Sequence, residues 1–299
     1  MPVGSRLRYL TRIDWGDAEV SDLFHISIRL LSGAIGAEVR GVDLKSAGKA
    51  AWDEIQSVFL DRLVLFFPNQ NLCPKEMTEV GARFGEPDYY PFIEGLAEAP
   101  HIIPLVKEAN EKKNFGEGWH SDTTYTRRPP KATCLYSVEV PEIGGDTLFA
   151  NMYLAYETLS DGMKALLSPL KAVNSAAARK DGGRAAGNDY QSVKLINRGE
   201  DLKGIHPVVR THPETGRKAL YVNSLHTTHF EGWTQAESRP ILKYLYKHKS
   251  RPEFTCRYSW EADTFAIWDN RAAQHFALND YHGQRREMRR LSIAGDMPT

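Results

Sequence analysis

The stretch Trp119-His120-Ser121-Asp122 contains a histidine and a carboxylate two residues apart, and the rest of the chain is organised around this pair. On an extended segment such residues point to the same side, so both side chains can bind one metal ion. A mononuclear non-haem iron centre of the facial-triad type also needs a second histidine and open coordination positions. The best candidate is His275, which follows the apolar run Phe265-Ala266-Ile267-Trp268 and a polar turn. His120, Asp122 and His275 are therefore the candidate metal ligands.

An isolated His-x-Asp pair carries little information, because a half-buried imidazole bonded to a backbone carbonyl explains it equally well. Other motifs in the chain support a metal site at this pair. Gly144-Gly145-Asp146-Thr147 follows it, and Arg286 and Arg290 follow the distal histidine. If the arginine segment is extended, these two share one face while Arg285 and Arg289 point the other way. The alternative is a basic surface turn before a strand.

Composition and charge are those of an ordinary globular protein. Hydrophobic residues make up 41% of the 299 residues and charged ones 25%, and no segment has the composition of a long linker, so one large domain is favoured. The 38 basic and 38 acidic side chains cancel, so no global field favours nucleic acid or an anionic membrane. Three cysteines without C-x-x-C spacing indicate the free thiols of a reducing compartment. Without an apolar signal segment or a run of about 18 apolar residues, a cytoplasmic protein is expected.

Hydrophobic periodicity predicts many short strands and a few helices. Strands are expected as a pair within residues 26–44 and at residues 63–67, 101–106, 132–140, 146–150, 206–209, 219–223, 254–257, 264–268 and 290–294. Helices are expected at residues 51–62, 74–84, 153–167 and 235–247. This pattern predicts a mainly β fold with flanking helices, a β-sandwich or jelly roll. A doubly wound fold would alternate strands with long helices.

Two segments lie outside that pattern. Residues 1–24 have no clear period and are expected to be an N-terminal extension of a domain that spans residues 25–299. Residues 172–192 are rich in alanine, glycine and charge, and an irregular insertion of this length in a compact domain is usually functional or disordered. The sequence does not decide whether this segment is a lid over the site or a solvated loop.

The motifs together resemble the TauD/TfdA family of taurine and phenoxyacetate dioxygenases, from about Leu31 to Pro298. The resemblance is carried by Trp119-His120-Ser121-Asp122, Gly144-Gly145-Asp146-Thr147, Thr211-His212-Pro213, Tyr221-Val222-Asn223, Trp268-Asp269-Asn270-Arg271 and Gln284-Arg285-Arg286. It implies a double-stranded β-helix, which is a jelly-roll variant. It also implies an enzyme that uses iron(II), with 2-oxoglutarate and dioxygen as cosubstrates.

The same resemblance assigns roles to individual residues. The three candidate ligands bind the iron, and Thr147 and Arg286 bind the distal carboxylate of 2-oxoglutarate. Arg290 matches the position that holds the substrate anion in the sulfonate-binding members. These roles agree with the chemistry, because 2-oxoglutarate occupies two of the three open positions on iron and its far carboxylate needs a fixed counter-charge. Since Asp122 is present, no position opens for a halide, and a halogenase is disfavoured.

The resemblance narrows the substrate to a small organic anion. Taurine is disfavoured, because this chain has Tyr90 and Gly116 where the taurine enzymes carry a histidine and an asparagine. Stretches such as Phe254-Thr255-Cys256-Arg257 resemble the phenoxypropionate-type enzymes, which cleave an aryl ether by hydroxylating the carbon beside oxygen. We therefore expect an aryloxyalkanoate-type carboxylate. The expected substrate-binding residues are Arg290, Tyr89, Tyr90, Thr123 and Tyr221.

Other functions stay open on the sequence alone. An alkyl sulfate or sulfonate would satisfy the same arginine, and so would a carboxylic acid oxidised in a biosynthetic pathway. A metal-binding barrel that acts as a sensor or scaffold is the alternative outside enzymes, although it would not need residues for a cosubstrate. The resemblance also implies a homodimer or homotetramer. No nucleic-acid or membrane partner is expected.

Overall fold

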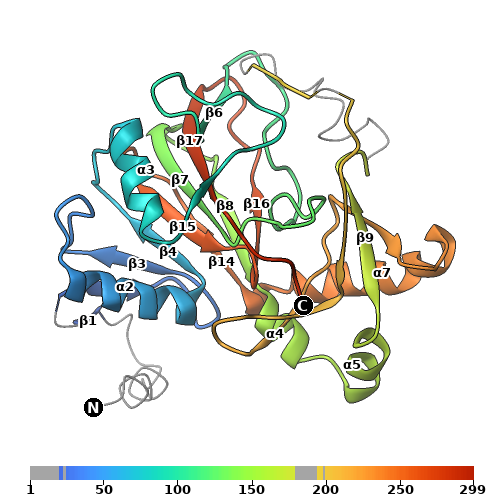
Figure 1. Ribbon diagram of the computed structural model, residues 1–299. Helices are drawn as coiled ribbons and strands as arrows, with labels where there is room; N and C mark the ends of the chain where they lie inside the picture. Colours follow the sequence, from blue (N-terminus) through green and yellow to red (C-terminus); the bar gives the residue numbers. More distant parts are fainter. Residues whose placement is uncertain (1–19, 23–24, 179–193, 198) are drawn as a thin grey trace.

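One central strand separates two hydrophobic cores. β4 (Val64–Phe67) is buried along its whole length, and its alternate residues enter different clusters of apolar side chains. Val64 and Phe66 belong to the first core, whereas Leu65 and Phe67 belong to the second. A strand that is covered on both faces requires this pattern. The structure is a computed structural model that describes residues 20–22, 25–178, 194–197 and 199–299 (Figure 1).

The larger sheet joins strands that are far apart in the sequence. Its order is β1-β2-β3-β4-β15-β7-β17-β5, and β6 also pairs with β17. The strands are β1 (Val20–Asp22), β2 (Ser27–Leu30), β3 (Ala37–Arg40), β4, β15 (Phe265–Asp269), β7 (Ala132–Glu139), β17 (Arg286–Ile293), β5 (Pro87–Asp88) and β6 (Ile102–Lys107). Only β3 and β4 are parallel among these described strands. The segment before β7 is thereby brought close to the C-terminal strands.

A smaller sheet faces the larger one. In it, β8 (Thr147–Asn151) lies between β14 (Thr255–Tyr258) and β16 (Ala273–Ala277). The first core fills the space between the sheets. There Phe66 stacks on Tyr258 with ring centroids 3.6 Å apart, and Phe149 meets its edge at 5.5 Å. Two packed, mainly antiparallel sheets confirm the predicted mainly β jelly roll.

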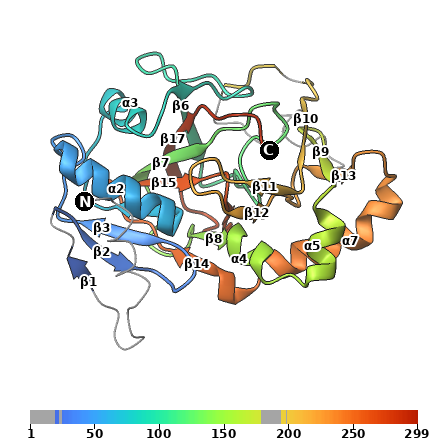
Figure 2. The ribbon, with the colours of Figure 1, turned by 60° about the horizontal axis from the view of Figure 1, so that its bottom comes forward.

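Helices cover the outside of this sandwich. α2 (Lys49–Arg62) and α3 (Pro74–Ala82) lie on the outer face of the larger sheet, where Ile55, Phe59 and Met77 form the second core with strand residues (Figure 1). α4 (Met152–Glu157), α5 (Asp161–Leu167) and α7 (Gln235–Lys249) lie on the opposite side of the molecule (Figure 2). A short 3-10 helix, η2 (Pro252–Phe254), leads into β14.

The helix expected over residues 153–167 is in fact two helices, α4 and α5. Ser160 ends the run, because its Oγ accepts a hydrogen bond from the backbone N of Met163 (3.3 Å) and caps a new helix. The predicted strand pair within residues 26–44 is β2 and β3, and a hairpin is formed by β11 (Val209–Thr211) and β12 (Lys218–Leu220). Apolar spacing finds such elements but does not locate their caps.

The expectation of an irregular insertion at residues 172–192 was wrong at its start. β9 (Lys171–Ser175) pairs with β10 (Lys203–Pro207) on one side and β13 (Thr227–Phe230) on the other. Its stability comes from these two partners, which no local pattern reveals. Residues 179–192 lie outside the described residues, so the lid remains a prediction.

The predicted boundary between an extension and a domain also remains a prediction. Most of residues 1–24 lie outside the described part of the chain, but Val20–Asp22 pairs with β2 and belongs to the larger sheet. Among the helices of the described residues, none is long and apolar enough to span a membrane. Cys134 and Cys256 are buried and Cys73 is exposed, and all three are free thiols.

Candidate metal centre and anion-binding residues

A backbone bridge joins the two candidate histidines. The N of His120 donates to the O of His275 (3.0 Å), and the N of His275 donates to the O of His120 (2.9 Å). Asp122 Oδ1 lies 3.6 Å from His120 Nε2 and 4.0 Å from His275 Nε2. One ligand atom of each residue lies within 4.8 Å of the others, and all three residues are buried. The donor set therefore fits a single metal ion, as the sequence predicted.

The imidazole of His120 is held in the form that a metal ligand needs. Its Nδ1 lies 2.8 Å from the carbonyl oxygen of Gly118. Because a carbonyl oxygen only accepts, Nδ1 carries a hydrogen in this contact, and Nε2 is the ring nitrogen that is left for a metal ion. Nε2 is the atom that faces Asp122. A second hydrogen bond of this kind is the usual way in which proteins orient a metal-binding histidine.

Asp122 is fixed by three residues that the sequence analysis did not single out for this role. The hydroxyl of Thr133 donates to Asp122 Oδ2 (2.7 Å), which leaves Oδ1 directed at the two histidines. Asn270 donates to Thr133 Oγ1 (2.8 Å) and accepts from the backbone N of Asp122 (3.2 Å). Trp268 Nε1 donates to the same amide oxygen of Asn270 (3.1 Å). The motif Trp268-Asp269-Asn270-Arg271 was the signal that could have found two of them.

The carboxylate of Asp122 is ionised although it is buried. Burial raises its pKa, but the positive charge of Arg290, together with His275 and His120, lowers it well below the ordinary value for aspartate. Arg290 Nη2 lies 3.3 Å from Asp122 Oδ2. An ionised carboxylate is the form that binds a cation.

Thr147 and Arg286 form a second polar group in the same pocket. Thr147 Oγ1 accepts a hydrogen bond from Trp260 Nε1 (3.0 Å), so its own proton is available to an acceptor. Arg286 is 6% exposed, and its Nε and Nη2 have no hydrogen-bond partner among the described residues. Burial lowers the pKa of this guanidinium. A buried guanidinium with unused donors is suited to bind a carboxylate.

Two glycines allow the chain to bring Thr147 to this place. Gly144 and Gly145 have φ values of 87° and 71°, which L side chains rarely adopt. A Cβ on Gly144 would lie 2.8 Å from Asp280 Oδ1, and that same oxygen accepts a hydrogen bond from the N of Gly145 (2.8 Å). The tight turn therefore fixes the start of β8 against the loop before β17.

The alternation predicted for the arginines of β17 is confirmed. Arg286 and Arg290 are 6% and 3% exposed, whereas Arg285 and Arg289 are only partly buried. Met288, which has the same parity as the buried pair, belongs to the first core. The side chains of Arg286 and Arg290 therefore face the space between the sheets.

The pocket around these groups has one charged side and one apolar side. Its apolar lining comes from Leu105, Phe115, Leu135, Trp268 and Ala277. Tyr90 lies next to this pocket, because the guanidinium carbon of Arg290 is 4.9 Å from the centre of its ring. Its hydroxyl lies 3.3 Å from that of Tyr125. An anion with an apolar body would match this arrangement.

Three of the expected substrate-binding residues lie elsewhere, and we correct that expectation. Tyr89 is 63% exposed and packs on His101, because adjacent residues of an extended segment point to opposite sides and Tyr90 takes the inner one. Thr123 forms a turn after Asp122 and lines a surface groove with Tyr89. Tyr221 is buried against Arg210, at 5.0 Å from its guanidinium. None of the three lines the metal pocket of the described chain.

Comparison with known proteins gives one consistent family. The family model "Taurine catabolism dioxygenase TauD, TfdA family" matches residues 27–292. An alpha-ketoglutarate-dependent sulfate ester dioxygenase from Pseudomonas putida is 35% identical over 280 residues, which is 91% of each chain. An (S)-phenoxypropionate/alpha-ketoglutarate-dioxygenase from Sphingobium herbicidovorans is 31% identical, over 89% of this chain and 94% of the relative. The crystal structure of a taurine dioxygenase from Burkholderia xenovorans superposes with a TM-score of 0.77 at 34% identity, covering 92% of this chain and 93% of that one.

Proposed function

Since the chain belongs to the TauD/TfdA family of iron(II)- and 2-oxoglutarate-dependent dioxygenases, we propose that it hydroxylates a C–H bond of a small organic anion, and that this anion is an alkyl sulfate ester. The observation that carries the proposal is the pairing of a three-residue metal site with two separate buried arginines in one pocket. One arginine serves the cosubstrate and the other the substrate. A barrel that only binds metal would need neither.

Iron(II) is held by His120, Asp122 and His275 in this proposal. The fit rests on the three ligand atoms within 4.8 Å of one another and on the ionised, hydrogen-bonded carboxylate of Asp122. Three protein ligands leave three positions for cosubstrate and dioxygen. When bound, the iron supplies the oxidising chemistry that decarboxylates 2-oxoglutarate and hydroxylates the substrate.

Arg286 and Thr147 bind the distal carboxylate of 2-oxoglutarate. The guanidinium offers two unused donors and the threonine hydroxyl one more. Because these groups and the iron ligands line the same pocket, a dicarboxylate held by Arg286 and Thr147 at its distal end can present its keto acid end to the metal.

Arg290 binds the sulfate group of the substrate. Its Nη2 lies 3.3 Å from Asp122 Oδ2, but its Nη1 and Nη2 make no hydrogen bond within the described chain, and its guanidinium packs over the ring of Tyr90. The apolar wall, including Leu105 and Phe115, receives the alkyl chain. Hydroxylation of the carbon that bears the sulfate oxygen gives a hemiacetal ester, whose carbon–oxygen bond to sulfate then breaks. The products are an aldehyde, hydrogen sulfate, succinate and carbon dioxide.

An aryloxyalkanoate is the second candidate substrate. The phenoxypropionate dioxygenase from Sphingobium herbicidovorans is 31% identical over 89% of this chain, and a carboxylate would satisfy Arg290 as well as a sulfate does. The same hydroxylation beside an ether oxygen would release a phenol. Taurine fits less well, because Tyr90 and Gly116 stand where the family resemblance places the histidine and the asparagine of the taurine enzymes.

Two further proposals concern the setting of the enzyme. We propose that it works in the cytoplasm, on the basis of its free thiols. We also propose a homodimer or homotetramer, on the basis of the family resemblance. Sedimentation of the purified protein at several concentrations measures the oligomeric state.

The experiment that tests the function measures succinate. Protein is loaded with iron(II) and 2-oxoglutarate without oxygen, mixed with air, and assayed with alkyl sulfates, aryloxyalkanoates, taurine and other sulfonates. We expect succinate above the uncoupled background with alkyl sulfates, together with one sulfate per succinate. If only aryloxyalkanoates raised succinate formation, the proposed alkyl sulfate substrate would be wrong and an aryloxyalkanoate would take its place. If no 2-oxoglutarate-dependent band formed with iron(II), the sensor or scaffold function would replace the enzyme.

A further inference from the structure

A second buried cation lies beside Arg286. Lys107 ends β6, and the register of the sheet places it opposite Arg286 at the start of β17. Residues directly opposite each other in antiparallel strands project to the same face. Lys107 is 4% exposed, and its Nζ has no hydrogen-bond partner in the part of the chain that the structure describes. Two neighbouring strands thus bury two cations with unused N–H groups.

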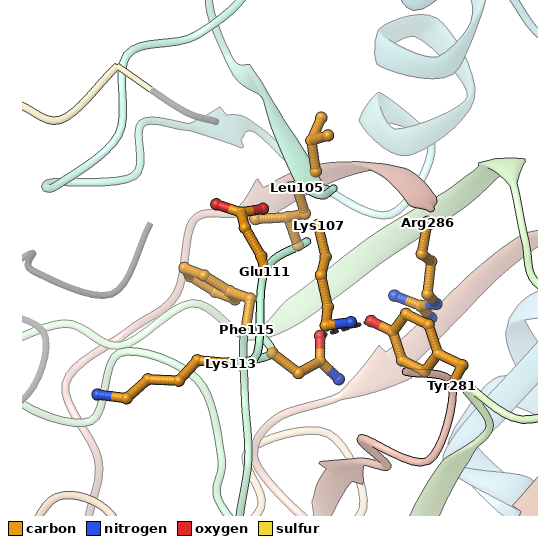
Figure 3. Close-up of a pocket in the computed structure, with 9 residues that line it drawn as sticks. Leu105, Lys107, Glu111, Lys113, Phe115, Tyr281 and Arg286 are labelled. Carbon is orange, nitrogen blue, oxygen red and sulfur yellow. Dashed lines mark hydrogen bonds between the residues drawn. The ribbon is translucent and has the colours of Figure 1, made fainter. Parts of the chain in front are cut away.

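Both cations belong to one hollow beside the metal pocket. Figure 3 shows the amino group of Lys107 and the guanidinium of Arg286 reaching the same tyrosine, Tyr281. Lys107 Nζ lies 4.3 Å from the centre of the Tyr281 ring. The hollow shares Arg286, Leu105 and Phe115 with the metal pocket, so the two spaces adjoin.

Among the described residues, none makes a hydrogen bond or an ion pair with Lys107 Nζ. The hydroxyl of the neighbouring Tyr281 donates to Asn114 Oδ1 (3.0 Å) and does not bond the ammonium group. Burial lowers the pKa of Lys107, and the charges of Glu111 and Glu117 offset this only in part. A buried cation without a hydrogen-bonded partner costs free energy, and a second cation opposite adds repulsion. A bound anion would remove both costs.

We propose that Lys107 is a further cosubstrate-binding residue, whose ammonium group binds the distal carboxylate of 2-oxoglutarate together with Arg286 and Thr147. The inference rests on the proposed function. A carboxylate offers about four lone-pair sites on two oxygens, which is enough for a guanidinium, a hydroxyl and an ammonium group. Lys107 then selects 2-oxo acids that carry a second carboxylate.

The test compares two cosubstrates that differ only at the distal end. 2-Oxoglutarate carries the second carboxylate, whereas 2-oxopentanoate has a methyl group in its place. Both chelate iron(II) through the same keto acid, so the visible band of the iron complex gives a dissociation constant for each without turnover. We expect Lys107→Met to raise the dissociation constant of 2-oxoglutarate about tenfold, since a hydrogen bond to a charged group is lost. The constant for 2-oxopentanoate should change less than about twofold.

Lys113→Met is the matched control. Lys113 lines the same hollow but is exposed, and its side chain points away from Arg286 (Figure 3). The control should bind both 2-oxo acids as the unmodified protein does. Equal weakening of both 2-oxo acids by Lys107→Met would mean a merely structural role, and unchanged binding of 2-oxoglutarate would also overturn the inference. If the unmodified protein formed no band with either acid, the proposed function would fail and the inference with it.

Thermal unfolding checks that the variant is folded. Without cosubstrate, Lys107→Met should unfold at the same or a higher temperature, because methionine removes a buried charge that has no hydrogen-bond partner among the described residues. With saturating 2-oxoglutarate, the increase in unfolding temperature should be smaller for the variant than for the unmodified protein. If Lys107→Met unfolded at a lower temperature without cosubstrate, the proposal that Lys107 needs a bound anion would be contradicted. Lys107→Gln, which keeps a donor without the charge, should give an intermediate dissociation constant.

Discussion

Arg285 and Arg286 are adjacent in the chain, yet their guanidinium groups have opposite surroundings. Arg285 forms ion pairs with Glu108 (3.1 Å), with Glu287 (2.7 Å) and with Glu139, and these acids raise its pKa. Arg286 is buried, and its Nε and Nη2 have no hydrogen-bond partner within the described residues. The first arginine is satisfied by the protein itself. The second has donors that no described residue uses and that a ligand can satisfy, so a buried guanidinium with unused donors marks the site better than charge alone.

The largest effect is expected where a ligand of the metal is removed. Asp122→Ala should abolish iron-dependent succinate formation and weaken iron binding by at least about 100-fold, because even outer partners of metal ligands cost 10- to 100-fold. Succinate assay and iron titration measure the two effects. Asp161→Ala, at an exposed helix terminus, is the control and should leave both unchanged. If the Asp122→Ala variant still turned over, Asp122 could not be a required metal ligand.

Substitution of the two buried arginines should affect the binding of different ligands. Arg286→Ala should raise the KM for 2-oxoglutarate about 100-fold and spare the KM for the substrate, since a charge-assisted contact contributes up to about 3 kcal/mol. Arg290→Ala should raise the KM for the substrate and leave the KM for 2-oxoglutarate unchanged. Steady-state kinetics with each ligand varied in turn separates them. Arg289→Ala, on the outer face, is the control. Equal loss of both ligands in either variant would contradict the division of roles.

The hydrogen bond from Thr133 to Asp122 should have an intermediate effect. Thr133→Val keeps the shape of the side chain and removes the donor at 2.7 Å from Asp122 Oδ2. We expect iron to bind about 10-fold more weakly, and the free energy of unfolding to fall by about 1–3 kcal/mol, because the buried Nδ2 of Asn270 loses its acceptor. Thr158→Val, at the exposed end of α4, removes a hydroxyl far from the site and is the control. If iron affinity were unchanged, Asp122 would be positioned without Thr133.

Local chemistry explains which parts of the site were predictable. His120 and Asp122 were proposed from their spacing on one segment, whereas the roles of Thr147, Arg286 and Arg290 came from the family resemblance. Thr133 was missed because it bonds Asp122 from another segment of the chain, and a threonine in an apolar strand has no signature of its own. Lys107 was missed for the same reason, since only the pairing of β6 with β17 places it opposite Arg286.

The incorrect predictions concern which side of a strand a residue faces and which strands pair with one another. The sequence shows that Tyr89 and Tyr90 are adjacent, but which of them faces inward depends on β5 pairing with β17, and Tyr90 takes the inner side. β9 was missed because it is short and mixed, and β10 and β13 stabilise it from both sides. The burial of His212 against Asp269 (3.0 Å), in the turn between β11 and β12, became visible only in the structure.

The smallest effect is expected at the arginine with the most ion pairs. Arg285→Ala should leave both KM values unchanged and lower the free energy of unfolding by no more than about 1 kcal/mol, because partly exposed ion pairs contribute little and are screened by salt. Denaturant unfolding at low and high salt measures this, and the difference from the unmodified protein should shrink at high salt. A large loss of 2-oxoglutarate affinity in Arg285→Ala would mean that the outer face of β17 also contributes to the site. The contrast between Arg285 and Arg286 would then have to be explained by strand position and not by unsatisfied charge.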